Sequence, residues 1–380
     1  MRVRAVREAE REQHTVECRQ SAVPFRTLGR QGQTDPRPCR LASARFSPED
    51  DTKDTTVFDS VLLVSFGGPQ GRDDIRPFLA NVLRGRRVTP ERVEQVAHHY
   101  ELFDGVSPLT AITMRQADGL RSRLAAAGQP LPVYVGMRNW HPFLADTLRQ
   151  MYADGARRAI GFIAAAHHSY SSCQQYRENV ANARAEVRRD GIDVDVTYVA
   201  SWFDHPLFVR ANAEHVLKAR DRLAADVRAQ ARLVFTAHSI PMPMAERSRY
   251  REQLEISARL VAAEAGIGDW TLVFQSRSGR PEDPWLEPDV CDYLRRESAT
   301  GLRAVVLCPI GFLCDHIEVL YDLDREAAAV CRELGVPMQR AETVNDDPLF
   351  LEMMAEVVLK TAQRFAGRPL PIAPGSTVSR

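Results

Sequence analysis

Eight short apolar segments, rich in β-branched residues, alternate along the chain with stretches of helical periodicity. They occupy residues 61–66, 131–137, 158–166, 194–201, 232–239, 271–276, 303–310 and 336–342. This alternation is typical of βαβ units, which build parallel sheets. Because the segments are apolar on both faces, helices must cover both sides of each sheet. The sequence therefore predicts an α/β protein with two similar lobes, each holding a four-stranded parallel sheet flanked by helices.

The texture of the sequence divides the chain of 380 residues into four parts. Residues 1–56 mix arginines with acids and prolines, show no sustained periodicity and are expected to form a disordered extension. The N-terminal lobe is predicted over 57–201 and the C-terminal lobe over 202–366. A last helical segment, 347–366, is expected to pack back across both lobes, and 367–380 to form a flexible tail.

Composition excludes several functional classes. Lys+Arg and Asp+Glu both number 50, and this balance argues against a nucleic-acid partner, which usually requires a basic excess. No apolar stretch approaches the ~18 residues of a membrane span. Seven scattered cysteines do not suggest a disulfide framework. The expected compartment is the reducing cytosol.

Common catalytic and nucleotide-binding motifs are missing. No GxGxxG follows a predicted strand, and the sequence has no Walker A, HExxH, GxSxG or CxxC motif. The sequence therefore offers no support for a dinucleotide, NTP, zinc-protease, hydrolase or dithiol site.

One histidine lies where a ligand crevice is expected. In FTAHSIP, residues 235–241, an apolar strand ends on His238 and is broken by a proline. Ligands of open parallel sheets bind outside the carboxyl ends of the strands. A histidine with satisfied hydrogen bonds is the simpler interpretation for such a residue alone.

A line of carboxylates follows the seventh predicted strand. Asp315 is expected to cap a helix, with Glu318 at the spacing of a capping box. Glu318, Asp322 and Glu326 are then expected on one helix face, where like charges repel by roughly 0.2–0.5 kcal/mol per pair. Such a face is either simply solvated or suited to a hard cation or a proton relay. Glu318 begins its helix at the edge where His238 ends its strand, and this favours a functional pair.

Several long motifs in one order give this sequence a resemblance to a known family. They are LLVSFGGP, GVSPL, GMRNW, SYSSCQQY, FTAHSIP, FQSR with PWLEPDV, and CPIGFLCDHIEVLYDLD, spread over about residues 58–366. In these the chain resembles the ferrochelatases, which insert Fe(II) into a porphyrin in haem biosynthesis. The resemblance implies the class II chelatase fold, with two Rossmann-like lobes and the porphyrin between them.

The resemblance also implies roles for particular residues. His238 and Glu318 correspond to the catalytic pair, and either could bind iron while the other takes protons. Asp322 and Glu326 correspond to an acidic track that leads metal or protons inward. Iron would be a substrate, and no cofactor is required. Expected substrate contacts are Phe66, Arg84, Ser107, His168 and Tyr176.

Two departures from relatives affect these expectations. Some relatives have a metal-facing tyrosine where Phe66 stands, so Phe66 is expected to be either core or an apolar floor for the ring. Some hold a [2Fe–2S] cluster on one mid-chain cysteine and three near the C-terminus. Cys173 matches the first, but no cysteine follows Cys331. A cluster needs four ligands and is not expected; Cys308, Cys314 and Cys331 are expected to be packing residues.

The segment over the expected cleft bears on substrate choice. Residues 78–109 are short and highly charged where membrane-associated members have a long apolar lip. Arg84, Arg86 and Arg87 could pair with propionates, although they could equally belong to a solvated loop. A second propionate-binding arginine of some relatives corresponds to His99 here. Polarity favours coproporphyrin III over protoporphyrin IX, and a cytosolic enzyme without integral membrane contact.

Two alternatives remain open from the sequence. The first is a cobalt or nickel chelatase of another tetrapyrrole, since the adjacent histidines His167 and His168 resemble the paired histidines of such enzymes. The second is a non-catalytic porphyrin or haem carrier. A carrier would be expected to lose the proton-handling pair, whereas His238 and Glu318 are both present.

Overall fold

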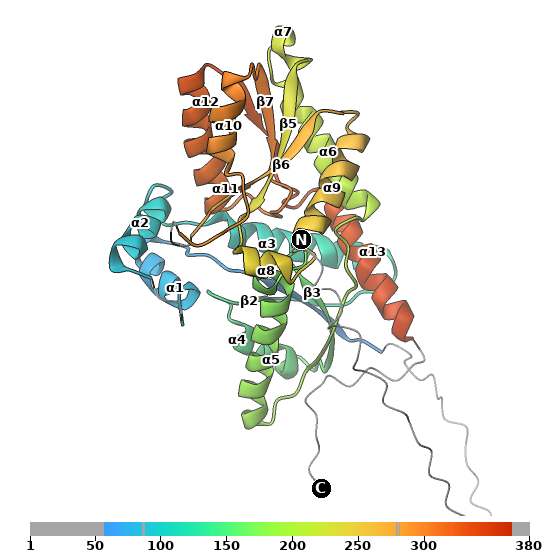
Figure 1. Ribbon diagram of the computed structural model, residues 1–380. Helices are drawn as coiled ribbons and strands as arrows, with labels where there is room; N and C mark the ends of the chain where they lie inside the picture. Colours follow the sequence, from blue (N-terminus) through green and yellow to red (C-terminus); the bar gives the residue numbers. More distant parts are fainter. Residues whose placement is uncertain (1–56, 86–87, 279, 281, 367–380) are drawn as a thin grey trace, which may run out of the picture. The chain divides into compact units, whose positions relative to one another are not determined.

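Eight parallel strands form two sheets of four in the computed structural model, which describes residues 57–85, 88–278, 280 and 282–366 (Figure 1). The strands are β1 Ser60–Ser65, β2 Val133–Met137, β3 Arg158–Ile163, β4 Asp195–Tyr198, β5 Ala231–His238, β6 Trp270–Gln275, β7 Ala304–Cys308 and β8 Met338–Arg340. Their orders are β2-β1-β3-β4 and β6-β5-β7-β8. The predicted fold class is confirmed. The expectations for 1–56 and 367–380 lie outside the described residues.

Helices fill the intervals between the strands. In the first half they are η1 Arg72–Asp74, α1 Ile75–Val82, α2 Pro90–Glu101, α3 Pro108–Ala126, α4 Leu144–Ala153, η2 Tyr170–Gln174, α5 Gln175–Val187 and η3 Arg188–Asp190. In the second half they are α6 Pro206–Asp221, α7 Ala225–Arg228, α8 Met242–Glu246, α9 Tyr250–Glu264, α10 Val290–Ala299, α11 Ile317–Tyr321, η4 Asp322–Ala327, α12 Ala328–Leu334 and α13 Pro348–Phe365.

The first sheet is buried on both faces, which explains why its strands are continuously apolar. Leu62 and Val64 pack with α4 and α5 on one face, while Val61 and Leu63 pack toward α3 and α13 on the other. All four side chains are fully buried, and each contributes roughly 1.5–3 kcal/mol by leaving water. The two-residue period of the strand sends successive side chains to opposite cores.

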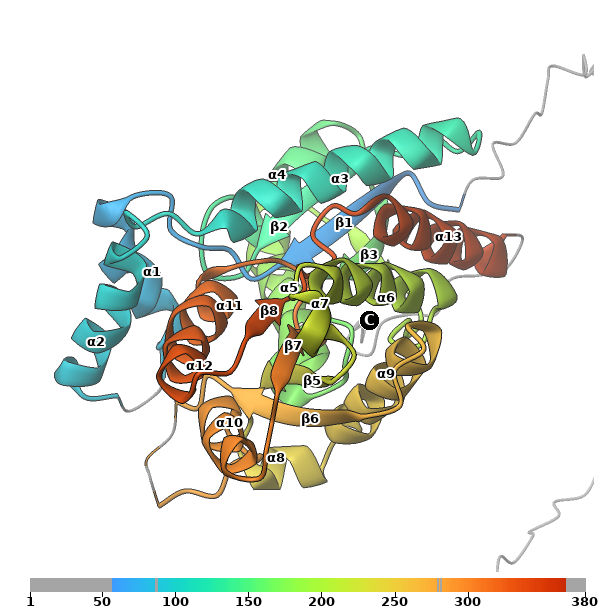
Figure 2. The same cartoon turned by 90° about the horizontal axis from the view of Figure 1, so that it is seen from above.

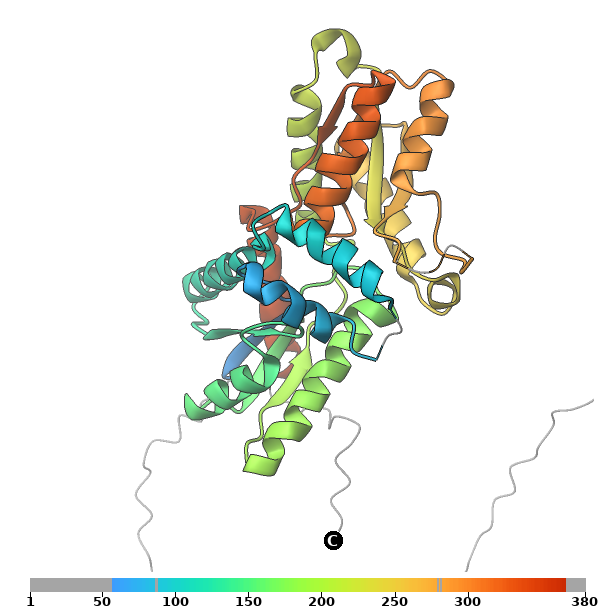
Figure 3. The ribbon, with the colours of Figure 1, turned by 90° about the vertical axis from the view of Figure 1, so that its left-hand side faces the viewer.

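The second sheet follows the same plan. Val234 faces the core made by α10 and α12, which stand side by side (Figures 1 and 3). Its neighbours Leu233 and Phe235 face the core that includes α6 and α9. β5 is central, so the residue at its carboxyl end, His238, lies beside the end of β7 and the segment that follows it. This arrangement positions the candidate site.

Helix α13 packs against α3 of the first half and α6 of the second (Figure 2). Its Phe350 is buried beside Trp202 and Phe208, with ring centroids 5.9 and 6.3 Å away. A Cβ on Gly119 of α3 would lie 2.4 Å from a methyl carbon of Leu351, so glycine is what lets the two helices approach. Helix α13 thus contacts a helix of each half.

Candidate active site

His238, at the carboxyl end of β5, faces Glu318 of α11, the helix that follows the neighbouring strand β7. The imidazole Nε2 lies 3.8 Å from a carboxylate oxygen of Glu318. Nδ1 donates a short hydrogen bond to the Ser239 carbonyl, and this orients the ring so that Nε2 faces Glu318. The Tyr250 hydroxyl donates to the His238 carbonyl at 3.1 Å and fixes the strand end. The two side chains are 33% and 41% exposed, so a substrate can reach both.

A second imidazole, from His316, also contacts Glu318. Its Nε2 lies 3.6 Å from the same carboxylate oxygen, and its side chain is 18% exposed. Sequence reasoning missed it, because residues two apart on a helix do not share a face. His316 instead precedes α11 with an extended backbone (φ −105°, ψ −179°), and this lets its ring turn toward Glu318. Its Nδ1 is buried and has no hydrogen-bond partner among the described residues.

The charges around Glu318 and Asp322 drive their proton affinities apart. Burial alone would raise the pKa of Glu318, but His238 and His316 outweigh it and lower that pKa to about 2. Burial raises the pKa of Asp322 to about 7, and the charges of Glu318 and Glu326 add to this despite a hydrogen bond from Ser276. One carboxylate is thus ionised at neutral pH, while its neighbour exchanges a proton there. Carboxyl groups separated in this way are suited to acid–base work.

The expected regular helix carrying all three carboxylates is not observed. α11 has five residues and passes at Asp322 into the π-helical turn η4, which changes the side-chain spacing. Gln275 donates both to the Glu318 carbonyl at 3.2 Å and to the Asp322 carboxylate at 3.3 Å, which ties those two residues together. Glu326 lies farther along and is exposed, with a raised pKa caused first by partial burial of its carboxyl group.

The predicted capping box of Asp315 and Glu318 is wrong. The residue at the helix N-cap is His316, and no side chain caps the helix. Asp315 instead accepts hydrogen bonds from Arg340 at 2.8 Å and from the Asn345 amide at 3.0 Å. Arg340 also reaches Asp324, at 2.6 and 2.9 Å. This arginine, 12% exposed, therefore clamps the segment on both sides of Glu318.

Replacing the clamp is expected to cost stability. Arg340→Gln should lower the free energy of unfolding by about 2 kcal/mol, because two carboxylates lose charge-assisted hydrogen bonds. Chemical denaturation measures this, with Arg295→Gln as the control. Arg295 makes only an exposed ion pair with Asp292, and its loss should cost less than about 0.5 kcal/mol. Equal effects of the two variants would contradict the clamp.

Aromatic and cationic groups of the first half complete the surroundings. The Arg138 guanidinium lies over the ring of Phe66 at 5.5 Å and over that of Tyr176 at 5.3 Å. Phe66 is half-buried beside Phe78, whereas Tyr176 is buried. Burial raises the pKa of Tyr176 to about 12, and Glu318 is one of the charges that add to it. Arg138 lies within the GMRNW motif, but the motif alone did not mark it as a site residue. Its position between the two rings makes it a candidate.

The expected propionate contacts occupy varied environments. Arg84 is exposed after α1 and donates to Asn81 at 2.6 Å, while Arg86 and Arg87 lie outside the described residues. Ser107 is buried at the start of α3, against Gly68. His99 stacks on Tyr321 with ring centroids 3.7 Å apart. Burial lowers the pKa of His99 to about 4, so it carries no charge for a carboxylate at neutral pH.

His168 and the cysteines occupy different environments. His168 is exposed, with Nδ1 2.6 Å from the sulfur of Cys173. Cys308, Cys314 and Cys331 are buried, as packing residues would be. Within the described ranges, no three His, Cys, Asp or Glu side chains converge as a preformed metal site. The expectation of no cluster stays a prediction.

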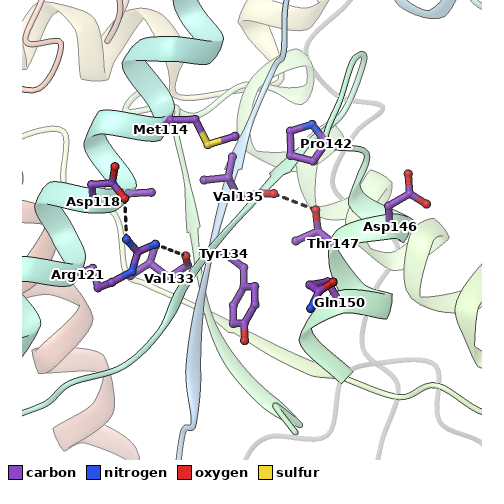
Figure 4. A pocket seen from close by; sticks show the side chains of 11 residues that line it. Met114, Asp118, Arg121, Val133, Tyr134, Val135, Pro142, Asp146, Thr147 and Gln150 are labelled. Carbon is purple, nitrogen blue, oxygen red and sulfur yellow. Dashed lines mark hydrogen bonds and ion pairs between the residues drawn. The ribbon is translucent and has the colours of Figure 1, made fainter. Parts of the chain in front are cut away.

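A cavity of about 470 Å³ lies away from this chemistry, between α3 and α4 at the free edge of β2 (Figure 4). Arg121 bonds Asp118 at 2.6 Å and the Val133 carbonyl at 3.0 Å, and Thr147 donates to the Val135 carbonyl at 2.8 Å (Figure 4). These side chains thus satisfy backbone carbonyls at the free edge of β2. Unpaired carbonyls at a sheet edge can otherwise form hydrogen bonds with another strand. We assign this cavity no reaction.

The fold and the facing pair define a class: an α/β protein with histidine–carboxylate chemistry at the carboxyl ends of parallel strands. The Ferrochelatase family model matches residues 59–362, and the chain belongs to the ferrochelatase family. The structure contains, among its described residues, no helix both long and apolar enough to cross a bilayer.

Curated relatives match over most of their length. The ferrochelatase of Rhodopirellula baltica is 48% identical, covering 82% of this chain and 88% of its own. The coproporphyrin III ferrochelatase of Streptomyces griseus is 46% identical over 84% and 89% of the two chains. The coproporphyrin III ferrochelatase of Mycolicibacterium paratuberculosis is 48% identical, and the match covers 79% of this chain and 87% of that relative.

Proposed function

We propose that the protein is a ferrochelatase that inserts Fe(II) into coproporphyrin III in haem biosynthesis. The observation that carries this is the facing pair, with His238 Nε2 3.8 Å and His316 Nε2 3.6 Å from the same carboxylate oxygen of Glu318. Family membership supports the reaction, and the names of several relatives support the porphyrin.

The reaction requires both metal ligands and bases. Entry of Fe(II) into a free-base porphyrin forms bonds to four nitrogens and releases two pyrrole protons. A neutral imidazole with a free Nε2 can accept a proton or bind iron, and an ionised carboxylate can do the same. A separation of 3.8 Å allows one cation, with bonds of about 2.1 Å, to contact both atoms.

Asp322 and Glu326 are proposed to carry metal or protons between the pair and solvent. Asp322 is linked to Glu318 through Gln275 and has a pKa of about 7. A group that exchanges its proton near neutral pH can take one from the pair and pass it outward. Glu326, which is exposed, is suited to the outer end of this path.

For the porphyrin, we propose Phe66 and Tyr176 as ring contacts, with Arg84, Ser107 and His168 as polar contacts. Arg138, between the two rings, is added to this set because it brings a cation to their surface. His99 is neutral and brings no charge to a propionate, whereas Arg84 and Arg138 are two cations proposed for that role. The charged character of residues 78–109 supports a cytosolic enzyme.

Coproporphyrin III is expected to have a kcat/KM about tenfold above that of protoporphyrin IX. Its two extra propionates can meet arginines, and exposure reduces each charged contact to a fraction of its sheltered value. Arg84→Ala should reduce the difference in kcat/KM between the two porphyrins. Arg189→Ala, a surface control, should leave that difference unchanged. Added salt should also narrow it. Equal or better use of protoporphyrin by the wild type would overturn the substrate assignment alone.

The purified protein tests the reaction class directly. Fe(II) and coproporphyrin III should convert the free-base absorption spectrum to that of the metalloporphyrin, in parallel with Co(II), Ni(II) and Zn(II) trials. Preference for Co(II) or Ni(II) would favour the chelatase of another tetrapyrrole. Binding of porphyrin without spectral conversion would favour a carrier.

A further inference from the structure

A cavity of about 280 Å³ opens beside the carboxyl ends of β3 and β4 and has an unusual set of polar groups. Two arginines, a histidine, a glutamine and a serine line it: Arg177, Arg249, His168, Gln253 and Ser201. No aspartate or glutamate is among the described residues that line it. A surface with cations and donors but no acid attracts negative charge.

Gln253 supplies a buried donor whose orientation is fixed. This residue of α9 is 4% exposed, and its Oε1 accepts the backbone N–H of His168 at 2.6 Å. Because that bond requires the oxygen to face His168, the amide nitrogen is left as a donor. Because Gln253 lines the cavity, this nitrogen can donate a hydrogen bond to a molecule bound there.

Arg177 supplies the uncompensated charge. Its guanidinium lies over the ring of Tyr198, which also lines the cavity, with 4.6 Å to the ring centroid. No carboxylate of the described chain pairs with it. Arg249 differs, because Glu252 already holds it in a two-pronged ion pair at 2.7 and 2.9 Å. The net positive charge at the cavity therefore comes from Arg177.

We infer that this cavity binds a small oxyanion, either inorganic phosphate or the carboxylate arm of a larger molecule. The planar guanidinium of Arg177 matches two oxygens of such a group, and the Gln253 amide can donate to a third or share one. The volume is just below the range typical for drug-sized ligands, which suits an anion of a few heavy atoms.

The cavity is separate from the facing pair but connected to it by packed side chains. Neither His238 nor Glu318 lines it. His167, the buried neighbour of His168, has its ring centroid 6.4 Å from that of Tyr250. The Tyr250 hydroxyl in turn holds the His238 carbonyl. The contacts of His167 with Tyr250 and of Tyr250 with His238 thus join the neighbour of the cavity residue His168 to the strand end that carries His238.

Calorimetric titration of the full-length protein with sodium phosphate, at constant ionic strength in a phosphate-free buffer, tests the site. Saturable binding is expected, with the Kd raised roughly tenfold in Arg177→Gln through loss of a charged contact. Arg177→Lys should retain part of the affinity for phosphate, because lysine keeps the positive charge but lacks the planar guanidinium that can bind two oxygens at once. Arg189→Gln, an exposed arginine of the segment after α5, is the matched control and should behave as wild type.

Circular dichroism and thermal melting of each variant confirm that it is folded. No saturable phosphate binding by the wild type, or the same Kd in the folded Arg177→Gln variant, would overturn the proposal. The source of the anion is resolved by adding coproporphyrin III. If porphyrin and phosphate exclude each other in a manner that depends on Arg177, the site takes a carboxylate arm; if both bind together, it takes a free ion. The titration does not depend on iron insertion, so failure of the proposed function would leave its result interpretable.

Discussion

His238→Ala and Glu318→Gln are each expected to lower kcat for iron insertion by about 10²–10⁴-fold while porphyrin binding persists. General acid–base groups contribute on this scale, and the two side chains face each other with 3.8 Å between His238 Nε2 and a carboxylate oxygen of Glu318. Steady-state kinetics of metalloporphyrin formation gives kcat, and quenching of porphyrin fluorescence by the protein gives the affinity.

His98→Ala is the matched control for the histidine. Its side chain is 64% exposed and contacts Glu101 only through a surface ion pair. Near wild-type turnover by the His238 variant, or an equal loss in the His98 variant, would contradict the role of the facing pair. The double variant of His238 and Glu318 should be little worse than either single one, because groups that act as a unit are not additive.

Asp322→Asn is expected to change the free energy of unfolding of the metal-free protein in a pH-dependent way. The difference between variant and wild type should be more favourable to the variant at pH 8 than at pH 4, by about 3 kcal/mol. The pKa of Asp322 is raised to about 7 in the folded state, above its unfolded value of about 4. Between these pH values the native state holds a proton that the unfolded state has lost. Wild-type stability therefore falls as the pH rises through this window, and the asparagine variant escapes that loss.

Glu318 affects the stability of the protein in a different pH range, and its contribution changes with pH in the opposite direction. Its lowered pKa, about 2, contributes stability above the unfolded value of about 4.3, and this is lost as the pH falls toward 2. Urea denaturation from pH 4 to pH 8, with chelator present, isolates Asp322. Asp226→Asn, at an exposed position on α7, is the control. Parallel pH profiles for wild type and Asp322→Asn would contradict the raised pKa.

The sequence allowed the sheets and the central pair to be predicted, because both depend on local patterns. Continuous apolar segments such as 232–239 are buried on two faces, and a polar residue at such a strand end must point into the crevice. His238 and Glu318 were therefore placed on one edge without knowledge of the fold. Their separation of 3.8 Å needed the structure, because the pairing of β5 with β7 is a tertiary contact.

What could not be predicted depends on contacts distant in sequence. Arg340 draws Asp315 away from the helix end, so the capping box never forms and His316 takes the N-cap position. The helix also changes to a π-helical turn at Asp322. The spacing of apolar residues in the sequence does not reveal such a change. The neutral state of His99 follows from its stacking on Tyr321, more than two hundred residues later in the chain.

Helix α13 also determines how the protein comes apart. Because its residues share one hydrophobic core with α3, α6 and strands of both sheets, detachment of the helix would open that shared core in both halves. Heat or urea should therefore melt both halves in a single transition, and cutting the chain before Pro348 should release two fragments that are largely unfolded. A hinge that swings the halves apart would have to break this core.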